Sequence, residues 1–281
     1  MALCHPVFQV WSDFDTVTPM TLSDQLITLA HQLSQTLSNL SPNPPVSHIY
    51  NPLDYAREAY NTYLRRFARQ EGVILFMGMN PGPDGMAQTG IPFGAVNQVT
   101  QYLGITEGVT PPRGELLHPK KPVTAFKTTK IEPSGNRLWG LFRELFPDPA
   151  DFFREHLVLN FCPLLFLNQR GANVPPDKLP AQDRGIITPC DQTMAETIRI
   201  LRPRALVGIG NWAYQRFVSI KENYNLPTPG VHKILHPSPA SPAANRGWYS
   251  QAAKALYGDG LWPRDYYIQA QSLENRIKTG K

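Results

Sequence analysis

Three polar side chains stand where apolar segments of this sequence end beside proline or glycine: Asn80, Asn160 and His236. An asparagine amide can orient a water molecule, although it is not a strong base, and a histidine can donate a hydrogen bond to an oxygen on which negative charge develops. Asn160 offers both a donor and an acceptor, which fits the O4/N3–H edge of a uracil-like base, and Phe93 can stack on such a base. Together these side chains suit hydrolysis of an N-glycosidic bond, with the base leaving as a stabilised anion.

Four apolar segments would bring these side chains together. Residues 73–77, 156–161, 204–210 and 231–235 have the length and composition of buried parallel strands. Predicted helices alternate with them, so we expect an α/β fold with a four-stranded, mostly parallel sheet and helices on both faces. Because right-handed crossovers place the carboxyl ends of parallel strands along one edge, the three polar side chains are expected at one mouth. The helices are expected at residues 22–40, 54–69, 95–103, 136–146 (capped by Asn136), 188–201, 211–221 and 247–257.

Charge, cysteine content and missing motifs exclude several classes of protein. The net charge of +5 and the pI near 9.1 suit an anionic partner such as nucleic acid. The three cysteines are scattered, which indicates neither a disulfide framework nor a zinc site, and no apolar run reaches transmembrane length. The signatures of serine hydrolases (GxSxG), P-loop proteins (GxxxxGK[ST]) and dinucleotide-binding folds (GxGxxG) are absent. These features predict a soluble, intracellular protein, and none of them indicates a metal or cofactor site; reaction without metal or cofactor is what the family resemblance described next implies.

Several ordered motifs surround the polar side chains. They read GMNPGP at 78–83, GMAQTG at 85–90, PFG at 92–94, NFCPL at 160–164, HPSP at 236–239 and ANRGW at 244–248. This set closely resembles the single-strand-selective monofunctional uracil-DNA glycosylases, and the similarity covers roughly residues 50–265. The resemblance implies the three-layer α/β/α sandwich of the uracil-DNA glycosylases. It also implies excision of uracil, 5-hydroxymethyluracil and related oxidised pyrimidines from single- and double-stranded DNA by base flipping, in base excision repair.

The resemblance also assigns roles to individual residues. Asn80 would position the attacking water, and His236 would stabilise the leaving base at O2. Three residues would contact the base directly: Met79 through its backbone amide, Phe93 by stacking on the ring, and Asn160 by hydrogen bonds to the polar edge of the base. Gly82 and Gly85 would leave room near C5 of the base. Pro83 and Met86 belong to the same base-binding set.

The segment after His236 corresponds by resemblance to the wedge that fills the gap left by a flipped nucleotide. Ala240 stands where vertebrate members of the family carry arginine, so we expect a stronger preference for single strands or mismatches. The predicted wedge comprises Pro237, Ser238, Pro239, Ala240, Ser241, Pro242, Asn245 and Arg246.

The expected organisation is a helical N-terminal extension over residues 1–50, a glycosylase-like domain over 51–265 and a tail over 266–281. The leucine stripe of residues 22–40 is expected to pack on the core. We expect a monomer, located in the cytoplasm of a bacterial host or the nucleus of a eukaryotic one. Two other interpretations stay open: a module that recognises damaged bases without turnover, and a related glycosylase directed at hypoxanthine or xanthine.

Overall fold

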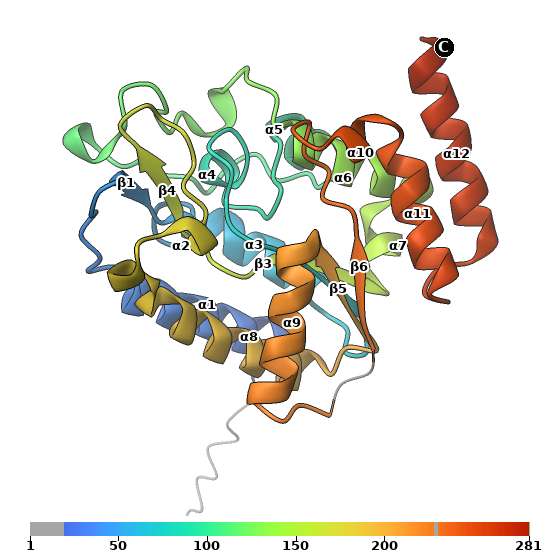
Figure 1. Ribbon diagram of the computed structural model, residues 1–281, viewed down its shortest axis with the longest axis horizontal. Coiled ribbons are helices and arrows are strands. Elements are labelled where there is room, and N and C mark those ends of the chain that lie inside the picture. The colour runs from blue at the N-terminus through green and yellow to red at the C-terminus, as the bar shows by residue number, and fades with distance from the viewer. Residues whose placement is uncertain (1–19, 228–229, 281) are drawn as a thin grey trace, which may run out of the picture.

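A four-stranded parallel sheet forms the centre of the protein (Figure 1). The computed structural model describes residues 20–227 and 230–280. The strands are β2 (Ile74–Gly78), β3 (His156–Asn160), β5 (Ala205–Ile209) and β6 (Val231–Ile234), in the spatial order β3-β2-β5-β6. All the neighbouring pairs of this sheet are parallel. β2 and β5 are buried along their whole length, because both of their faces are covered by helices. The predicted α/β class is confirmed.

Helices cover both faces of the sheet, as predicted. In Figure 1, α1 (Leu22–Thr36), α8 (Ile187–Leu201) and α9 (Asn211–Asn223) lie on one side, and α6 (Pro133–Leu145), α11 (Trp248–Gly258) and α12 (Arg264–Thr279) lie on the other. The remaining helices are α2 (Pro52–Tyr55), α3 (Arg57–Phe67), α4 (Met86–Thr89), α5 (Val96–Gln101), α7 (Pro149–Phe153) and α10 (Pro242–Asn245), with 3-10 turns at Gly114–Leu116, Ala125–Lys127, Pro176–Lys178 and Ala181–Ile186.

A two-stranded ribbon, which the sequence analysis missed, lies outside this sheet. β1 (Val46–Tyr50) pairs antiparallel with β4 (Leu165–Asn168). Because prolines flank both segments, the sequence predicted loops there. The two strands nevertheless pair, although they lie far apart in the chain. The ribbon therefore ties the N-terminal region to the segment that follows β3.

The leucine stripe of α1 packs as expected, with Leu26, Leu33 and Leu37 buried in the main hydrophobic cluster, although Leu40 is exposed. The C-terminal segment forms a more regular helix than its sequence suggested. The 16-residue α12 packs against α11, and the Glu274 carboxylate accepts a hydrogen bond from the Tyr249 backbone N–H (3.0 Å). The three proposed domain boundaries stay a prediction.

The start of α6 differs from the prediction in a way that bears on the site. The helix begins at Pro133, and its N-cap is Glu132, whose carboxylate accepts from the backbone N–H groups of Ser134 (3.1 Å) and Gly135. Proline at the first helical position after an acidic cap is a favourable arrangement. The predicted cap, Asn136, lies inside the helix, where its side chain accepts from Gln98 Nε2 (2.9 Å).

Candidate active site

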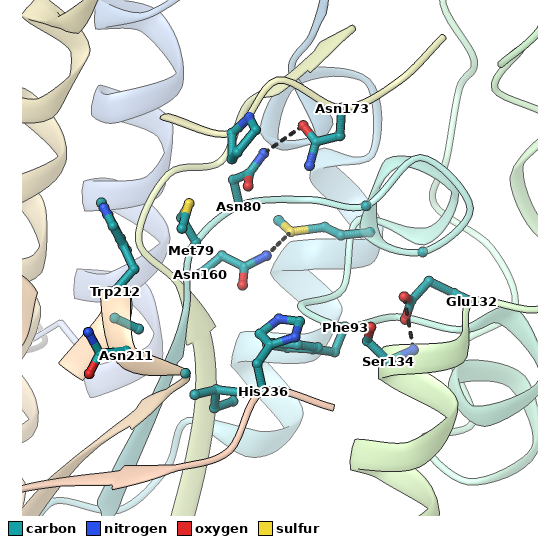
Figure 2. A pocket seen from close by; sticks show the side chains of 17 residues that line it. Met79, Asn80, Phe93, Glu132, Ser134, Asn160, Asn173, Asn211, Trp212 and His236 are labelled. Atoms are coloured by element: carbon teal, nitrogen blue, oxygen red, sulfur yellow. Dashed lines mark hydrogen bonds between the residues drawn. The ribbon is translucent and has the colours of Figure 1, made fainter. Parts of the chain in front are cut away.

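The carboxyl ends of β2, β3 and β6 open onto a cavity of about 380 Å³ (Figure 2). Asn80, Asn160 and His236 all line it, which confirms their predicted convergence. Parallel strands with crossovers of one hand account for this meeting of residues that are distant in sequence. The full lining comprises Met79, Asn80, Gly82, Gly85, Met86, Phe93, Glu132, Ser134, Asn160, Asn173, Pro175, Ile209, Gly210, Asn211, Trp212, Ala213 and His236.

Asn160 presents an unused acceptor. Its Nδ2 donates to the Met86 sulfur (3.2 Å), while its Oδ1 is buried without any hydrogen-bond partner. Leaving a buried acceptor unpaired costs on the order of 1–3 kcal/mol, unless a ligand supplies the donor. The second hydrogen of Nδ2 is free to donate beside it. The amide is thus arranged for a ligand edge that has one N–H and one carbonyl.

Asn80 is held by its amide nitrogen. Nδ2 donates to the carbonyls of Leu164 (3.3 Å) and Pro81 (3.4 Å) and to Asn173 Oδ1 (3.3 Å). Figure 2 shows this nitrogen turned toward Asn173, so that the amide oxygen points the other way. An amide oxygen so oriented can accept a hydrogen bond from a water molecule in the cavity.

His236 is neutral and has a defined tautomer. Burial lowers its pKa from 6.5 to about 4, so the ring carries no charge near pH 7. The Ser238 backbone N–H donates to Nδ1 (3.1 Å), which leaves the ring hydrogen on Nε2. The Phe93 ring lies 6.0 Å from the imidazole between centroids. The backbone of Phe93 has a φ of +53°, a left-handed conformation that is uncommon for a bulky residue and that clusters at functional sites.

Gly78 controls how closely the site is packed. A Cβ added there would lie 2.5 Å from both Asn160 Oδ1 and Phe93 Cε2, which is well inside van der Waals contact. The last residue of β2 must therefore be glycine for the Phe93 ring and the Asn160 amide to lie this close to the strand. Gly85 similarly admits the side chain of Glu132, because its added Cβ would meet Glu132 Cγ at 2.8 Å.

Some lining residues were not predicted. Glu132 was missed because Asn136 was predicted to be the helix cap. Asn173 was missed because its segment was predicted to be a loop, whereas Asn173 forms an antiparallel bridge with Leu167 of β4. Burial raises the pKa of Glu132, although hydrogen bonds from the Gly135 and Ser134 backbone oppose that shift. The first turn of α9 also forms part of the wall. The sequence did contain a signal for this part of the wall, because Gly210 ends the predicted strand and Asn211 follows it directly.

Other predicted residues lie outside the cavity lining. The carbonyl of Pro83 accepts from Gln88 Nε2 (2.8 Å), so this proline shapes the loop behind the cavity. The segment from Pro237 onward continues directly from His236 and reaches α10. Arg137 holds both ends of this segment, because it donates to the carbonyl of Pro237 (3.1 Å) and to Asn245 Oδ1 (2.9 Å). Ser238 to Ser241, the middle of the predicted wedge, contains the exposed Ala240.

Over residues 20–227 and 230–280, the structure contains no group of three or more His, Cys, Asp or Glu side chains that could hold a metal ion. Within the same ranges, no helix is long and apolar enough to cross a membrane.

Comparison with known proteins identifies the family. The family model of the uracil DNA glycosylase superfamily matches residues 66–256. A single-strand selective monofunctional uracil-DNA glycosylase of Rattus norvegicus is 44% identical over 233 residues, covering 83% of each chain. The Bos taurus protein of the same name is 40% identical over 247 residues, covering 88% of this chain and 90% of the relative. The crystal structure of Pedobacter heparinus SMUG2 shares the fold, with a TM-score of 0.56 and 16% identity over 92% of this chain and 98% of that one. The chain therefore belongs to the uracil DNA glycosylase superfamily, as its motifs predicted.

Proposed function

We propose that this protein is a monofunctional DNA glycosylase that hydrolyses the N-glycosidic bond of uracil and 5-modified uracils in DNA, as a step of base excision repair. The observation that carries the proposal is the unpartnered Oδ1 of Asn160, buried in a cavity beside Phe93. Its natural complement is the N3–H of a uracil-like base stacked on that ring. The names of the relatives, all glycosylases acting on uracil in DNA, point to the same reaction.

The geometry supports a defined division of labour. Nε2–H of neutral His236 donates to O2 of the flipped base, and the electron pair of the breaking C1′–N1 bond is delocalised onto that oxygen. A water held by Asn80 Oδ1 attacks C1′ and loses a proton, and the departing base anion takes up one proton, so the products are a neutral free base and an abasic sugar. Loss of one such oxyanion donor typically costs about 10²–10³ in rate. The reaction needs no lysine Schiff base, so no strand break accompanies it.

The base is selected by its polar edge and by its shape. The amide of Asn160 pairs with N3–H and O4, and Met79 contributes its backbone amide to the base. Gly82 and Gly85 put no side chain of their own on the C5 side of the base; Glu132 packs against Gly85 there, and the space at Gly82 accommodates 5-substituents such as hydroxymethyl. Pro83 acts through the shape of this loop.

DNA engagement is proposed to use the segment that follows His236. It enters the duplex as a wedge, and Ala240 makes that wedge shorter than an arginine would. Single-stranded and mismatched sites are therefore preferred over matched duplex, because a weaker wedge leaves more of the flipping cost uncompensated. Equal rates on single-stranded and matched double-stranded uracil would overturn this part of the proposal. The protein is proposed to act as a monomer, in bacterial cytoplasm or in the nucleus of a eukaryote.

The experiment that tests the function is base release from a single-stranded oligonucleotide bearing one uracil. The unaltered protein is compared with Asn80→Ala and His236→Ala, and the products are resolved before and after hot alkali. Strand breaks that appear only after alkali, and that both variants lose, are the expected result. Tight binding without an abasic product would instead favour a recognition module. The same assay on oligonucleotides that carry hypoxanthine or xanthine in place of uracil detects an altered base preference.

A further inference from the structure

The hydrogen bond between Asn160 and Met86 has a consequence beyond packing. Asn160 Nδ2 lies 3.2 Å from the Met86 sulfur, and Figure 2 shows this contact at the side of the cavity. A thioether is an acceptor and has no hydrogen to donate. It therefore stabilises the amide only when the nitrogen, and not the oxygen, faces the sulfur. The oxygen then lies over Gly78 beside the Phe93 ring, in the wall of the base cavity, where it has no protein partner.

The orientation of this amide decides which pyrimidine fits. With Oδ1 forward, Asn160 accepts from N3–H and donates to O4, which is the pattern of uracil. With the amide turned by 180°, it would donate to N3 and accept from a 4-amino group, which is the pattern of cytosine. Cytosine is a normal constituent of DNA, so the turned amide would threaten undamaged sites.

We propose that the Met86 sulfur is a positioning group that holds the Asn160 amide in the uracil-reading orientation and so discriminates against cytosine. This inference rests on the proposed function, because it concerns the same base cavity. It assigns to a buried thioether a role in specificity that a hydrophobic residue of equal size would not perform.

Met86 is well placed to hold its partner. Its side chain is 2% exposed and packs with Ala30 and Leu53, which belong to α1 and α2. The short helix α4 that carries it ends at Gly90, whose φ of +77° and close approach to Ala56 fix the turn. The sulfur is therefore anchored from the side opposite to the base.

A second, smaller cavity of about 40 Å³ lies behind the pair. Met86 and Asn160 line both cavities, and the rear one is completed mainly by side chains of α1 and α8, among them Met194. The free space means that steric packing alone does not fix the amide. The hydrogen bond to sulfur is the directional contact that remains.

The test is a double-mutant cycle on base preference, made with the full-length protein. The variants are Met86→Leu, Asn160→Ala and the combination of both. The readout is the ratio of affinities for two single-stranded oligonucleotides, which carry either uracil or cytosine on a sugar that 2′-fluorination protects from hydrolysis. Loss of a hydrogen bond worth about 1 kcal/mol predicts a roughly fivefold fall in the uracil preference of Met86→Leu. In the Asn160→Ala background the same substitution is expected to change nothing, because no amide remains to be oriented.

Met194→Leu is the matched control, since it removes a buried methionine from the rear cavity without touching the amide, and its preference is expected to equal that of the unaltered protein. An unchanged preference in Met86→Leu, or an equal loss in both backgrounds, would overturn the inference. Uracil release by the unaltered protein is measured separately. Failure there would refute the proposed function, whereas the affinity ratio decides the role of the sulfur.

Discussion

The substitution Gly78→Ala tests whether the observed cavity is the catalytic one. The new Cβ would lie 2.5 Å from Asn160 Oδ1 and from Phe93 Cε2, and 2.7 Å from Phe93 Cζ. Ordinary contacts begin near 3.4 Å, so both side chains must retreat by about 1 Å. A misplacement of that size costs about 10²-fold in rate when geometry controls the reaction. The fold itself should lose only about 1–3 kcal/mol, which is typical of one extra methyl group in a packed site.

The assay is single-turnover release of uracil from a single-stranded oligonucleotide, followed through alkali-labile strand breaks. Gly258→Ala is the matched control, because a Cβ there meets nothing within 4 Å. Thermal unfolding of both variants shows whether a loss of rate reflects loss of fold. A Gly78→Ala protein that is folded and within threefold of the normal rate would refute the assignment of Asn160 and Phe93 to the base site.

The remaining predictions concern protons and positioning. Because the pKa of His236 is about 4 and the neutral ring is the active donor, base release should be constant above pH 5 and fall as the pH drops through 4; a fall already at pH 6.5 would contradict the neutral tautomer. Burial also lowers the pKa of His156 from 6.5 to about 4, so the unfolded chain binds a proton in that window that the folded chain does not. His156 should therefore lower the free energy of unfolding by up to roughly 3 kcal/mol between pH 6.5 and 4, as measured by urea titration, and His156→Gln should remove this contribution while leaving the comparable one of His236. Asn173→Ala should lower kcat of base release by about tenfold with little change in KM, because it removes the one side-chain acceptor among the three groups that hold the Asn80 amide; a change confined to KM would show that Asn173 contacts DNA only.

The convergence of the three polar side chains on one cavity was predictable, because the same local rule applies to each of them. Asn80, Asn160 and His236 each follow a recognisable apolar strand, and parallel strands share an edge. Glu132 was not predicted because Asn136 was taken as the N-cap of this helix. The sequence alone does not show that the first helical turn already begins at Pro133, directly after Glu132. Asn173 was not predicted because the segment after β3 was interpreted as a loop rich in proline, glycine and asparagine, whereas the chain turns back there and Asn173 pairs with Leu167 of β4.

The β1–β4 ribbon limits how far this protein can be shortened. β1 covers residues 46–50, which precede the part matched by the family model, residues 66–256. A chain trimmed to the matched residues would keep the pairing of β4 with residues 172–174 but would leave the β4 edge that faces β1 without a partner strand. Such a bare strand edge invites pairing with other chains, so the trimmed protein should aggregate. The boundary of the family-model match is therefore not a safe boundary for cutting the chain, because the strand that protects β4 lies outside it.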